Sequence, residues 1–479
     1  MIALVLATFL IPFLGGALTL VIPRGMVKAL SQVTAFLAFL CSLLVLIDLG
    51  VAGQVASTVD LVSVANIVVF GVTIDKVSTL VGLAVILVGF LIVVYSTGYL
   101  TPGNREHPEP EVKRRYYFFL LMFIGSMAGL VYSSTMIGLL VFFELTGVCS
   151  WGLIGYYDDL KARKAAMKAI ITTQVASLGL YVATAVFFLS GTFDLSALSG
   201  MTDNAKIIIF IGVSIAAWGK SAQLPLHFWL PDAMVAPTPI SAYLHAASMV
   251  KVGVYIFARC LLSAGSVPHV IGTIGAVMAT ITMLYGFFMY FPQKDLKRLL
   301  AYSTITQLSY IFLALSLSIF GSTMAFNGAV AHIFNHAFAK GLFFLVAGAL
   351  SYAVGTKMLP SLKGIMTKLP LVGISFLFAT LAVSGVPPFS GFFSKFSILA
   401  GGFSAARGEP LLMVLMVIAV LETIGGFAWL FWIFGAAVPG EASSEVLSAT
   451  RLSPQIQFVL VALAFLTLFS GVFAAVWMG

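Results

Sequence analysis

The feature that most constrains this chain is a succession of apolar segments, each about 20 residues long. A helix of that length crosses the roughly 30 Å of hydrocarbon in a lipid bilayer. Of the 479 residues, 61% are hydrophobic and 9% are charged, and the mean hydropathy is +1.09. Soluble domains contain about 25% charged residues. The sequence therefore predicts an integral membrane protein that lies in a lipid bilayer.

The apolar segments predict an all-α polytopic membrane protein with about 14 transmembrane helices. The alternation of apolar and polar residues that is typical of β-strands is not apparent, which disfavours a transmembrane barrel. The first segment lacks the basic start and the small-residue cleavage site of a signal peptide, so it is interpreted as a spanning helix. The predicted spans begin near Met1, Val27, Val77, Tyr117, Met136, Ala166, Lys206, Pro239, Pro268, Arg298, Thr323, Leu371, Leu411 and Gln455.

The positions of the 25 Lys and Arg residues predict the orientation, since most of them fall in alternate connections. Such connections face the cytoplasm, which predicts a multi-pass protein of the cell membrane with both termini outside. The net charge of +8 then reflects topology, and no nucleic-acid role is expected. We expect the inner loop at 102–115 to be solvated. The same holds for Asp48, Asp60 and Asp75 in an outer connection, although these acids could also attract cations.

Six ionisable side chains lie inside predicted spans: Lys220, Lys251, Lys340, Lys395, Glu144 and Glu422. Each charge at the centre of a bilayer costs about 3 kcal/mol on insertion scales. Six uncompensated charges would cost roughly 18 kcal/mol, more than the 5–15 kcal/mol that stabilises a typical protein. We therefore expect these groups to be paired, hydrated or partly neutral. For one lysine alone, the alternative is a side chain that extends to the membrane interface.

Prolines near two of these lysines predict two discontinuous helices. Pro225 follows Lys220, and Pro387 and Pro388 precede Lys395. Proline removes a backbone donor and interrupts a helix, and paired interruptions mark the ion site in transporters. Because the two spans are five apart, an odd number, they predict two inverted five-helix repeats. The predicted divisions are an N-terminal three-helix region at 1–115, a first repeat at 116–265, a second repeat at 266–437 and a C-terminal helix at 438–479.

The segment HIFNHAFAK places His332, His336 and Lys340 at intervals of four residues within one apolar span. On a helix these side chains differ by about 40° and rise about 6 Å per step, so they form one polar stripe. Histidine titrates near neutrality, and a desolvated lysine can approach it, so a hydrated stripe can pass protons in steps. His245 adds an imidazole on another span. A buried pair of histidines without a transport role is the alternative.

A metal site is disfavoured, because Ile333 stands where the zinc signature HExxH requires a glutamate. Lys340 would also repel a cation. The cysteines Cys41, Cys149 and Cys260 show no CxxC spacing and are expected to be packing residues. We therefore expect no metal, no catalytic group and no cofactor in this chain, and any redox centres are expected on its partners. Glu144 has no basic neighbour in sequence, and pairing with a lysine such as Lys220 would allow it to ionise.

Four segments resemble the antiporter-like subunits of respiratory complex I and of Mrp-type multisubunit Na⁺/H⁺ antiporters. They are KSAQLPLHFWLPDAMVAPTPISAYLHAASMVKVGVYIFAR, KDLKRLLAYSTITQLSYI, HIFNHAFAKGLFFLVAGAL and SGVPPFSGFFSKFSIL. The first is closest to the Mrp A-type and large complex I subunits. Their C-terminal extensions are not found in this sequence, which is expected for a short version such as those of archaeal hydrogenase-like or sulfur-reducing relatives.

The resemblance implies fourteen spans, inverted repeats and a role for each charged group. Glu144 and Lys220 would form a pair, His245 and Lys251 a bridge, His332, His336 and Lys340 the central relay, and Lys395 the exit-side lysine. With Glu422, these residues form the predicted proton pathway.

The first functional hypothesis is a proton-translocating, antiporter-like subunit that assembles with other membrane subunits. The sequence leaves open whether it moves H⁺ alone or exchanges Na⁺ for H⁺. It also leaves open whether the complex is a redox-driven pump or an Mrp-only antiporter. The chain is not expected to be catalytic alone. The alternatives from other classes are a secondary transporter for a small solute and a structural scaffold subunit.

Overall fold

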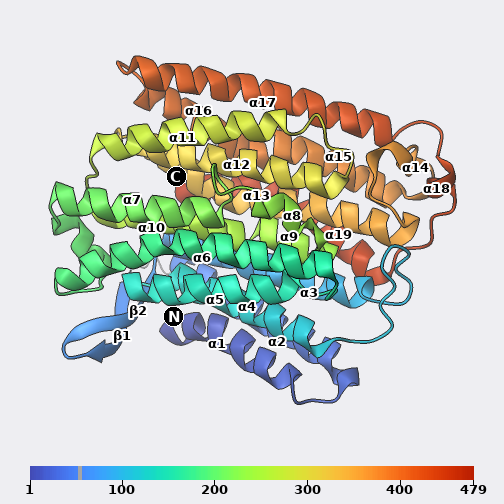
Figure 1. Ribbon diagram of the computed structural model, residues 1–479, viewed down its shortest axis with the longest axis horizontal. Helices are drawn as coiled ribbons and strands as arrows, with labels where there is room; N and C mark the ends of the chain where they lie inside the picture. The colour runs from blue at the N-terminus through green and yellow to red at the C-terminus, as the bar shows by residue number, and fades with distance from the viewer. Residues whose placement is uncertain (52–56) are drawn as a thin grey trace.

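The computed structural model describes residues 1–51 and 57–479. Long helices run nearly parallel in one elongated bundle (Figure 1). Twelve helical segments in the described residues are long and apolar enough to cross a membrane. The two other predicted spans are the interrupted segments described below. The α-helices are α1 (Ile2–Thr19), α2 (Arg24–Val51), α3 (Lys76–Tyr99), α4 (Arg114–Tyr132), α5 (Met136–Ile154), α6 (Leu160–Leu189), α7 (Asp203–Lys220), α8 (Trp229–Asp232), α9 (Thr238–Ala246), α10 (Met249–Ala264), α11 (His269–Phe288), α12 (Leu296–Ser318), α13 (Thr323–Val354), α14 (Ile365–Lys368), α15 (Pro370–Ser384), α16 (Ser390–Ala405), α17 (Pro410–Ala437), α18 (Ser444–Leu447) and α19 (Pro454–Met478).

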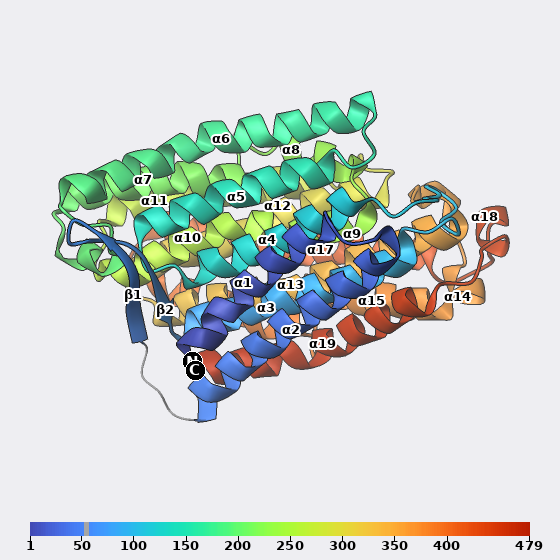
Figure 2. The same ribbon diagram turned by 90° about the horizontal axis from the view of Figure 1, so that it is seen from below.

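The two termini lie at the same end of the bundle (Figure 2). This end also carries a β-hairpin, and we call it the hairpin end. The connections that are rich in Lys and Arg lie at the opposite end, which we call the basic end. This arrangement places the termini opposite the basic connections, as the sequence predicts.

The β-hairpin was not expected from the sequence. It pairs β1 (Ser57–Val64) with β2 (Ile67–Ile74) in antiparallel register, with irregularities between Asp60 and Ser63. Ala65 and Asn66 at its turn both have positive φ angles, as tight hairpin turns require. β1 is largely exposed, so no buried face imposes an alternation of apolar and polar residues. The chain is mostly helical, as the sequence predicts, and the hairpin is an addition to that fold.

The helix that carries Lys220 is interrupted where the prolines predict. α7 ends at Lys220, and helix resumes only at Trp229. The second interruption separates α15 from α16, and Pro387 and Pro388 lie in it. A further break, at Ala247 and Ser248, separates α9 from α10. No proline lies at this third break, so the break was not predicted.

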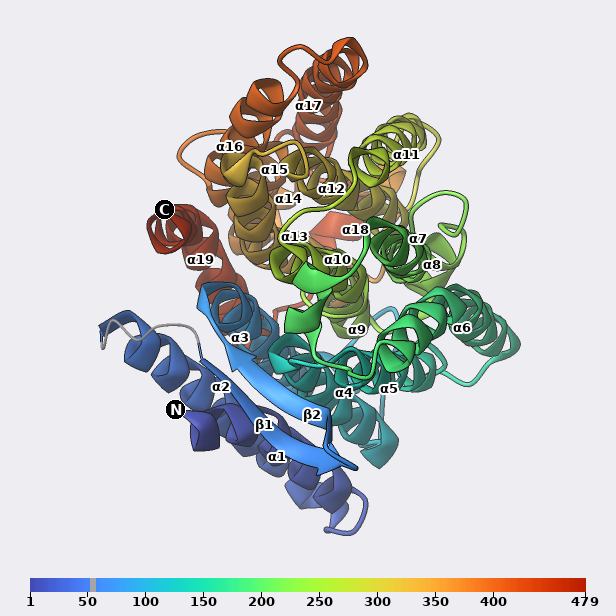
Figure 3. The same cartoon turned by 90° about the vertical axis from the view of Figure 1, so that its left-hand side faces the viewer.

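α13 lies at the centre of the bundle, surrounded by helices from all parts of the chain (Figure 3). It packs against α3, α9, α12, α15, α16 and α19. From Gly328 to Val354 every residue of α13 is buried. The helix that carries the predicted stripe of His332, His336 and Lys340 is thus the core of the fold. The inverted relation of 116–265 to 266–437 and the domain divisions stay predictions.

Glycines bring α7 into direct backbone contact with its neighbours on two sides. A Cβ atom on Gly212 of α7 would lie 2.3 Å from the carbonyl oxygen of Gly179 on α6. A Cβ atom on Gly253 of α10 would lie 2.2 Å from the carbonyl oxygen of Ala217 on α7. Real Cβ atoms do not approach this closely, so only glycine permits these crossings. α7 is therefore held between α6 and α10.

Candidate functional site

The central helix α13 presents His332 and His336 one above the other. Their ring centroids are 5.8 Å apart, and both side chains are 2% exposed. Lys340 lies one turn further along and is fully buried. The spacing of four residues thus produces one polar stripe inside the core, as the sequence predicts.

Each histidine of the stripe contacts a polar group on another helix. The Lys251 ammonium on α10 lies 2.9 Å from Nδ1 of His336. His332 lies 2.8 Å from the Ser394 hydroxyl on α16 and 3.2 Å from the Gln307 side-chain oxygen on α12. The stripe therefore connects α10, which follows the break at Ala247 and Ser248, to α16, which follows the break at Pro387 and Pro388.

Lys340 and His245 lie nearer the basic end of the same core. The Lys340 ammonium donates to the Ser303 hydroxyl at 2.6 Å and to the Leu300 carbonyl oxygen at 3.4 Å. His245 at the end of α9 is fully buried, and its ring centroid lies 4.6 Å from that of Phe344 on α13, with the two rings tilted by 35°. Neither ring nitrogen of His245 has a hydrogen-bond partner among the described residues. His245 is thus a buried group with unused hydrogen-bonding capacity.

Lys220, at the end of α7, faces α5, but its contacts differ from the predicted ones. Its ammonium donates to the Phe143 carbonyl oxygen at 3.0 Å and to the Thr146 hydroxyl at 3.1 Å. No ion pair with Glu144 is present in the described part of the chain. The two carboxylate oxygens of half-buried Glu144 have no hydrogen-bond partner among the described residues. Phe143 and Thr146 bind the ammonium, so Glu144 is not in direct contact with Lys220 in this structure, and the role of the pair stays a prediction.

The second lysine–glutamate set is connected through a tyrosine. The Lys395 ammonium on α16 lies 4.8 Å from the ring centroid of Tyr310 on α12 and 3.4 Å from the Ser384 carbonyl oxygen. The Tyr310 hydroxyl in turn lies 2.5 Å from Oε2 of Glu422 on α17. Glu422 is 3% exposed. Sequence reasoning proposed Lys395 and Glu422 but not the aromatic group between them.

Several neutral polar residues of the site were missed by sequence reasoning. Gln223, in the first interruption, accepts a hydrogen bond from Ser309 at 2.7 Å. Gln307 and Ser394 contact His332, and Tyr310 contacts Glu422. Gln307, Ser309 and Tyr310 all lie in TQLSYI of α12, within one of the segments that carry the family resemblance. A cluster of polar residues in a fully buried span is the signal that could have found them.

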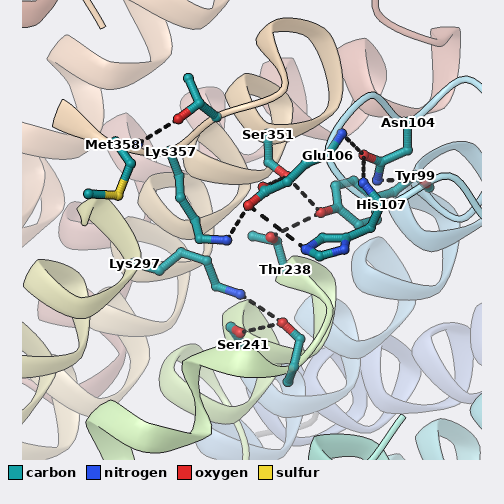
Figure 4. A network of polar contacts seen from close by, with 12 residues as sticks. Tyr99, Asn104, Glu106, His107, Thr238, Ser241, Lys297, Ser351, Lys357 and Met358 are labelled. Carbon is teal, nitrogen blue, oxygen red and sulfur yellow. Dashed lines mark hydrogen bonds and ion pairs between the residues drawn. The ribbon is translucent and has the colours of Figure 1, made fainter. Parts of the chain in front are cut away.

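The loop at 102–115 is largely exposed, as the sequence predicts, but some of its side chains are buried and anchor it to the bundle. Figure 4 shows Glu106 directed toward Lys357, which follows α13, and toward Ser351 within it. Glu106 forms an ion pair with Lys357 and accepts a hydrogen bond from Ser351. Burial opposes ionisation of Glu106, but the Lys357 ammonium and the Ser351 hydroxyl outweigh it, so the pKa of Glu106 lies below its ordinary value. Fully buried Asn104 closes the turn of this loop. The loop thus binds the end of α13.

A polar cavity of 610 Å³ opens beside this loop at the basic end. Lys297 and Thr238 line it, together with side chains of the loop and of α6. Lys297 was placed in a connection by its sequence position, yet it is 1% exposed and donates to the Ala236 carbonyl oxygen at 2.7 Å (Figure 4). Asp232, which also lines the cavity, forms an ion pair with Lys168 at 2.7 Å. The lining of this cavity thus combines buried side chains such as Lys297 with half-exposed ones such as Asp232.

Asp75 at the hairpin end is likewise not solvated. It accepts two hydrogen bonds from the Arg259 guanidinium, at 2.5 and 3.1 Å, and it caps the first turn of α3 through the backbone N–H of Ser78. Burial would raise the pKa of Asp75, but the guanidinium and Ser78 outweigh it, and the pKa lies below its ordinary value. Arg259 lies on a helix 184 residues away in sequence, so the ion pair could not be predicted from the sequence. A cavity of 1290 Å³ lies beside Asp75.

The described residues contain no group of three or more His, Cys, Asp or Glu side chains placed to hold a metal ion. The three cysteines are unpaired in the structure. The expectation that redox cofactors reside on partners stays a prediction.

Two models of known protein families match this chain, and together they cover most of the core. The model described as NADH:quinone oxidoreductase/Mrp antiporter, transmembrane part, matches residues 133–425. A second model, the N-terminus of chain 5 of NADH-ubiquinone oxidoreductase (complex I), matches residues 62–114. The chain belongs to the NADH:quinone oxidoreductase/Mrp antiporter family. This confirms the resemblance on which the residue roles were based, although it does not test those roles.

Curated relatives are similar over about two thirds of the chain. The chloroplastic NAD(P)H-quinone oxidoreductase subunit 5 of Anthoceros angustus is 37% identical over 352 residues, which is 69% of this chain and 46% of that protein. The NAD(P)H-quinone oxidoreductase chain 5 of Synechocystis sp. is 36% identical over 363 residues, which is 71% of this chain and 51% of that protein. The matched region thus spans about half the length of these relatives.

Two solved structures share the fold. The Mrp complex from Dietzia sp. contains a chain that is 27% identical, with a TM-score of 0.86, and the match covers 99% of this chain and 51% of that one. The archaeal membrane-bound sulfane sulfur reductase contains a chain with a TM-score of 0.84 at 23% identity, and the match covers 99% of this chain and 94% of that one. The second likeness shows the fold alone. Both support a polytopic membrane protein with the antiporter-like architecture.

Proposed function

We propose that this chain is a proton-translocating, antiporter-like membrane subunit of a larger complex. The observation that carries the proposal is a series of buried ionisable side chains that crosses the core from α7 to α17. Within it, Lys251 contacts His336, and His332 contacts α12 and α16. Buried ionisable groups inside a membrane are costly and mark ion pathways. The relatives are named as subunits of multisubunit oxidoreductases, and one structural neighbour is part of an Mrp complex, which supports assembly with other membrane subunits.

The chemistry of the series favours protons as the ion that moves through it. Lysine and histidine gain and lose protons, and four lysines repel metal cations. Hard cations bind to oxygen ligands, whereas the two carboxylates of the series lie on α5 and α17, on opposite sides of the bundle (Figure 3). Sodium exchange would therefore need a site elsewhere in the complex. We propose that partner subunits supply the driving force, with the basic end facing the cytoplasm.

Transport by the purified complex in lipid vesicles tests this proposal. Proton movement is followed with a pH-sensitive dye after single replacements Lys220→Ala, Lys340→Ala and Lys395→Ala. Each variant is expected to assemble and to lose proton transport. Lys206→Met is the matched control, because Lys206 is also buried, at 2% exposed, but its ammonium donates to three backbone carbonyls at the hairpin end. It should lower thermal stability and leave transport per assembled complex close to wild type.

Three results would contradict the proposal. Retained transport in all three lysine variants would indicate a scaffold whose charges only stabilise helix packing. A current that depends on a small organic solute, obtained from the chain alone, would indicate a secondary transporter. Proton movement that requires a sodium gradient and stops without it would show that sodium, too, is carried.

A further inference from the structure

The Tyr310 hydroxyl has more short contacts than its single proton can serve. It lies 2.6 Å from the Ala419 carbonyl oxygen, 2.5 Å from Oε2 of Glu422 and 2.5 Å from the Thr423 hydroxyl. Tyr310 is fully buried between α12 and α17. A phenol donates one hydrogen bond, and a carbonyl oxygen only accepts. At least two of the three contacts therefore need a proton from another group.

Counting protons identifies that group. Three short oxygen–oxygen contacts require three protons. Tyr310 supplies one, which is directed to Ala419, and the Thr423 hydroxyl supplies one to the phenol oxygen. Ala419 has none to give. A protonated Glu422 supplies the third by donating to the phenol oxygen, whereas an ionised Glu422 accepts the proton of Tyr310. The carboxyl oxygen is close enough to the phenol for either direction of the hydrogen bond.

When Glu422 is ionised, the same contacts must be rearranged. A carboxylate only accepts hydrogen bonds, so the Tyr310 hydroxyl has to turn from Ala419 toward Oε2 of Glu422. Thr423 can then donate to Ala419 instead, whose oxygen lies 3.0 Å from the Thr423 hydroxyl. The carboxyl of Glu422 thus keeps a hydrogen bond to Tyr310 in both of its protonation states. The hydroxyl of Tyr310 changes direction with the charge of the carboxyl.

The ionisable groups around Glu422 are few. Lys395 lies on α16, with its ammonium 4.8 Å from the Tyr310 ring centroid. Tyr290, which follows α11, is buried nearby. Across Pro370–Ser384 and Pro410–Ala437, the described helices α15 and α17 contribute no ionisable side chain other than Glu422 itself. Lys395 is therefore the only cation placed to exchange a proton with this carboxyl in the described part of the chain.

We propose that Glu422 is a proton-carrying group paired with Lys395, and that Tyr310 is the positioning residue that holds the carboxyl in both of its protonation states. In the exchange, an N–H bond of the Lys395 ammonium breaks and an O–H bond forms on Glu422, so that a charged pair becomes two neutral groups. The role of Glu422 and Tyr310 in transport rests on the proposed function. The contact between Tyr310 and Glu422 is independent of the proposed function.

Infrared difference spectra of the reconstituted complex test the contact directly. The protonated carboxyl band that disappears in Glu422→Gln is assigned to Glu422, and it is then compared between wild type and Tyr310→Phe. Tyr310→Phe keeps the ring beneath Lys395 but removes the acceptor of the carboxyl proton, so the band should move to higher frequency. Thr423→Val removes the second hydroxyl, keeps the shape of the side chain, and should also shift the band. Tyr95→Phe is the control, since that buried phenol donates to the Leu345 carbonyl oxygen, on other helices.

Transport measurements decide the role. Loss of a hydrogen bond to a charged group corresponds to a proton transfer that is about 10- to 100-fold slower in Tyr310→Phe, with Tyr95→Phe near wild type. An unchanged band in Tyr310→Phe and Thr423→Val would overturn the contact, and a shifted band with unchanged transport would overturn the positioning role. If the lysine variants retain transport, the proposed function fails, and the infrared comparison still decides the contact.

Discussion

The ion pair between Asp75 and Arg259 provides the sharpest test of how the hairpin end is stabilised. The Arg259 side chain is 4% exposed and that of Asp75 is 14% exposed. The guanidinium binds both carboxylate oxygens, and it also donates to the Tyr255 hydroxyl. Asp75→Asn removes the negative charge, but asparagine caps a helix as well as aspartate does. This replacement therefore isolates the loss of the counter-charge.

The structure sets the expected size of the effect. Removing one partner of a buried ion pair leaves an uncompensated charge and costs about 3–5 kcal/mol. Asp75→Ala additionally loses the cap on Ser78, which adds about 1 kcal/mol. Arg259→Met in the Asp75→Asn background removes the unpaired charge, so the double variant should be more stable than the sum of the single variants predicts.

The free energy of unfolding is measured by titrating a denaturing detergent into mixed micelles and following tryptophan fluorescence. The pH dependence provides a second observable. Because the pKa of Asp75 in the folded chain lies below its ordinary value of 3.8, the pair stabilises fully above that pH and is lost as the pH falls through the lowered value. Asp75→Asn should abolish this part of the acid sensitivity.

Two results would refute the reasoning. One is an Asp75→Asn variant within about 1 kcal/mol of wild type, which would show that Arg259 finds water or another acceptor. The other is additive behaviour of the double variant, which would show that the two side chains do not interact.

Two further predictions concern the loop and the helix crossings. Glu106→Gln should release the loop at 102–115 and accelerate its cleavage by trypsin at neutral pH. In wild type, hydrogen exchange of the loop should rise as the pH falls below the ordinary carboxyl value of 4.5, because the pKa of Glu106 is lowered. Glu111→Gln, in an exposed pair, should change little, and equal cleavage of both variants would contradict the docked loop. Gly212→Ala should destabilise the chain by about 1–3 kcal/mol in thermal unfolding. Gly435→Ala, with no atom near its added Cβ, should be neutral or stabilising. Equal melting temperatures of these two variants would refute the close crossing.

The parts of the site that could be predicted depend on a regular pattern within one element. His332, His336 and Lys340 repeat every four residues, so a single helix suffices to bring them together. The interruption after Lys220 follows from proline chemistry, which acts on the local backbone. These inferences need no knowledge of the neighbouring helices.

The parts that could not be predicted depend on contacts between distant elements. In the sequence, Tyr310 and Gln307 look like ordinary helix residues. Only the fold shows that Tyr310 contacts Glu422 and that Gln307 contacts His332. Asp75 was assigned to solvent because its partner, Arg259, lies 184 residues away. The pair of Glu144 and Lys220 followed from the resemblance, yet the ammonium is satisfied by a carbonyl and a hydroxyl of α5 instead. Spacing alone cannot rank such competing acceptors.

The glycine crossings of α7 limit how Lys220 can work. With its backbone wedged against Gly179 on one side and Gly253 on the other, α7 cannot slide or rotate without a steric clash. Any change of partner by the Lys220 ammonium must therefore come from rotation about the bonds of its own four-carbon arm, pivoting on a fixed Cα atom. Side-chain torsions of this kind relax far faster than rigid-body helix motions, so a change of partner by Lys220 would be fast and would leave the surrounding helices in place.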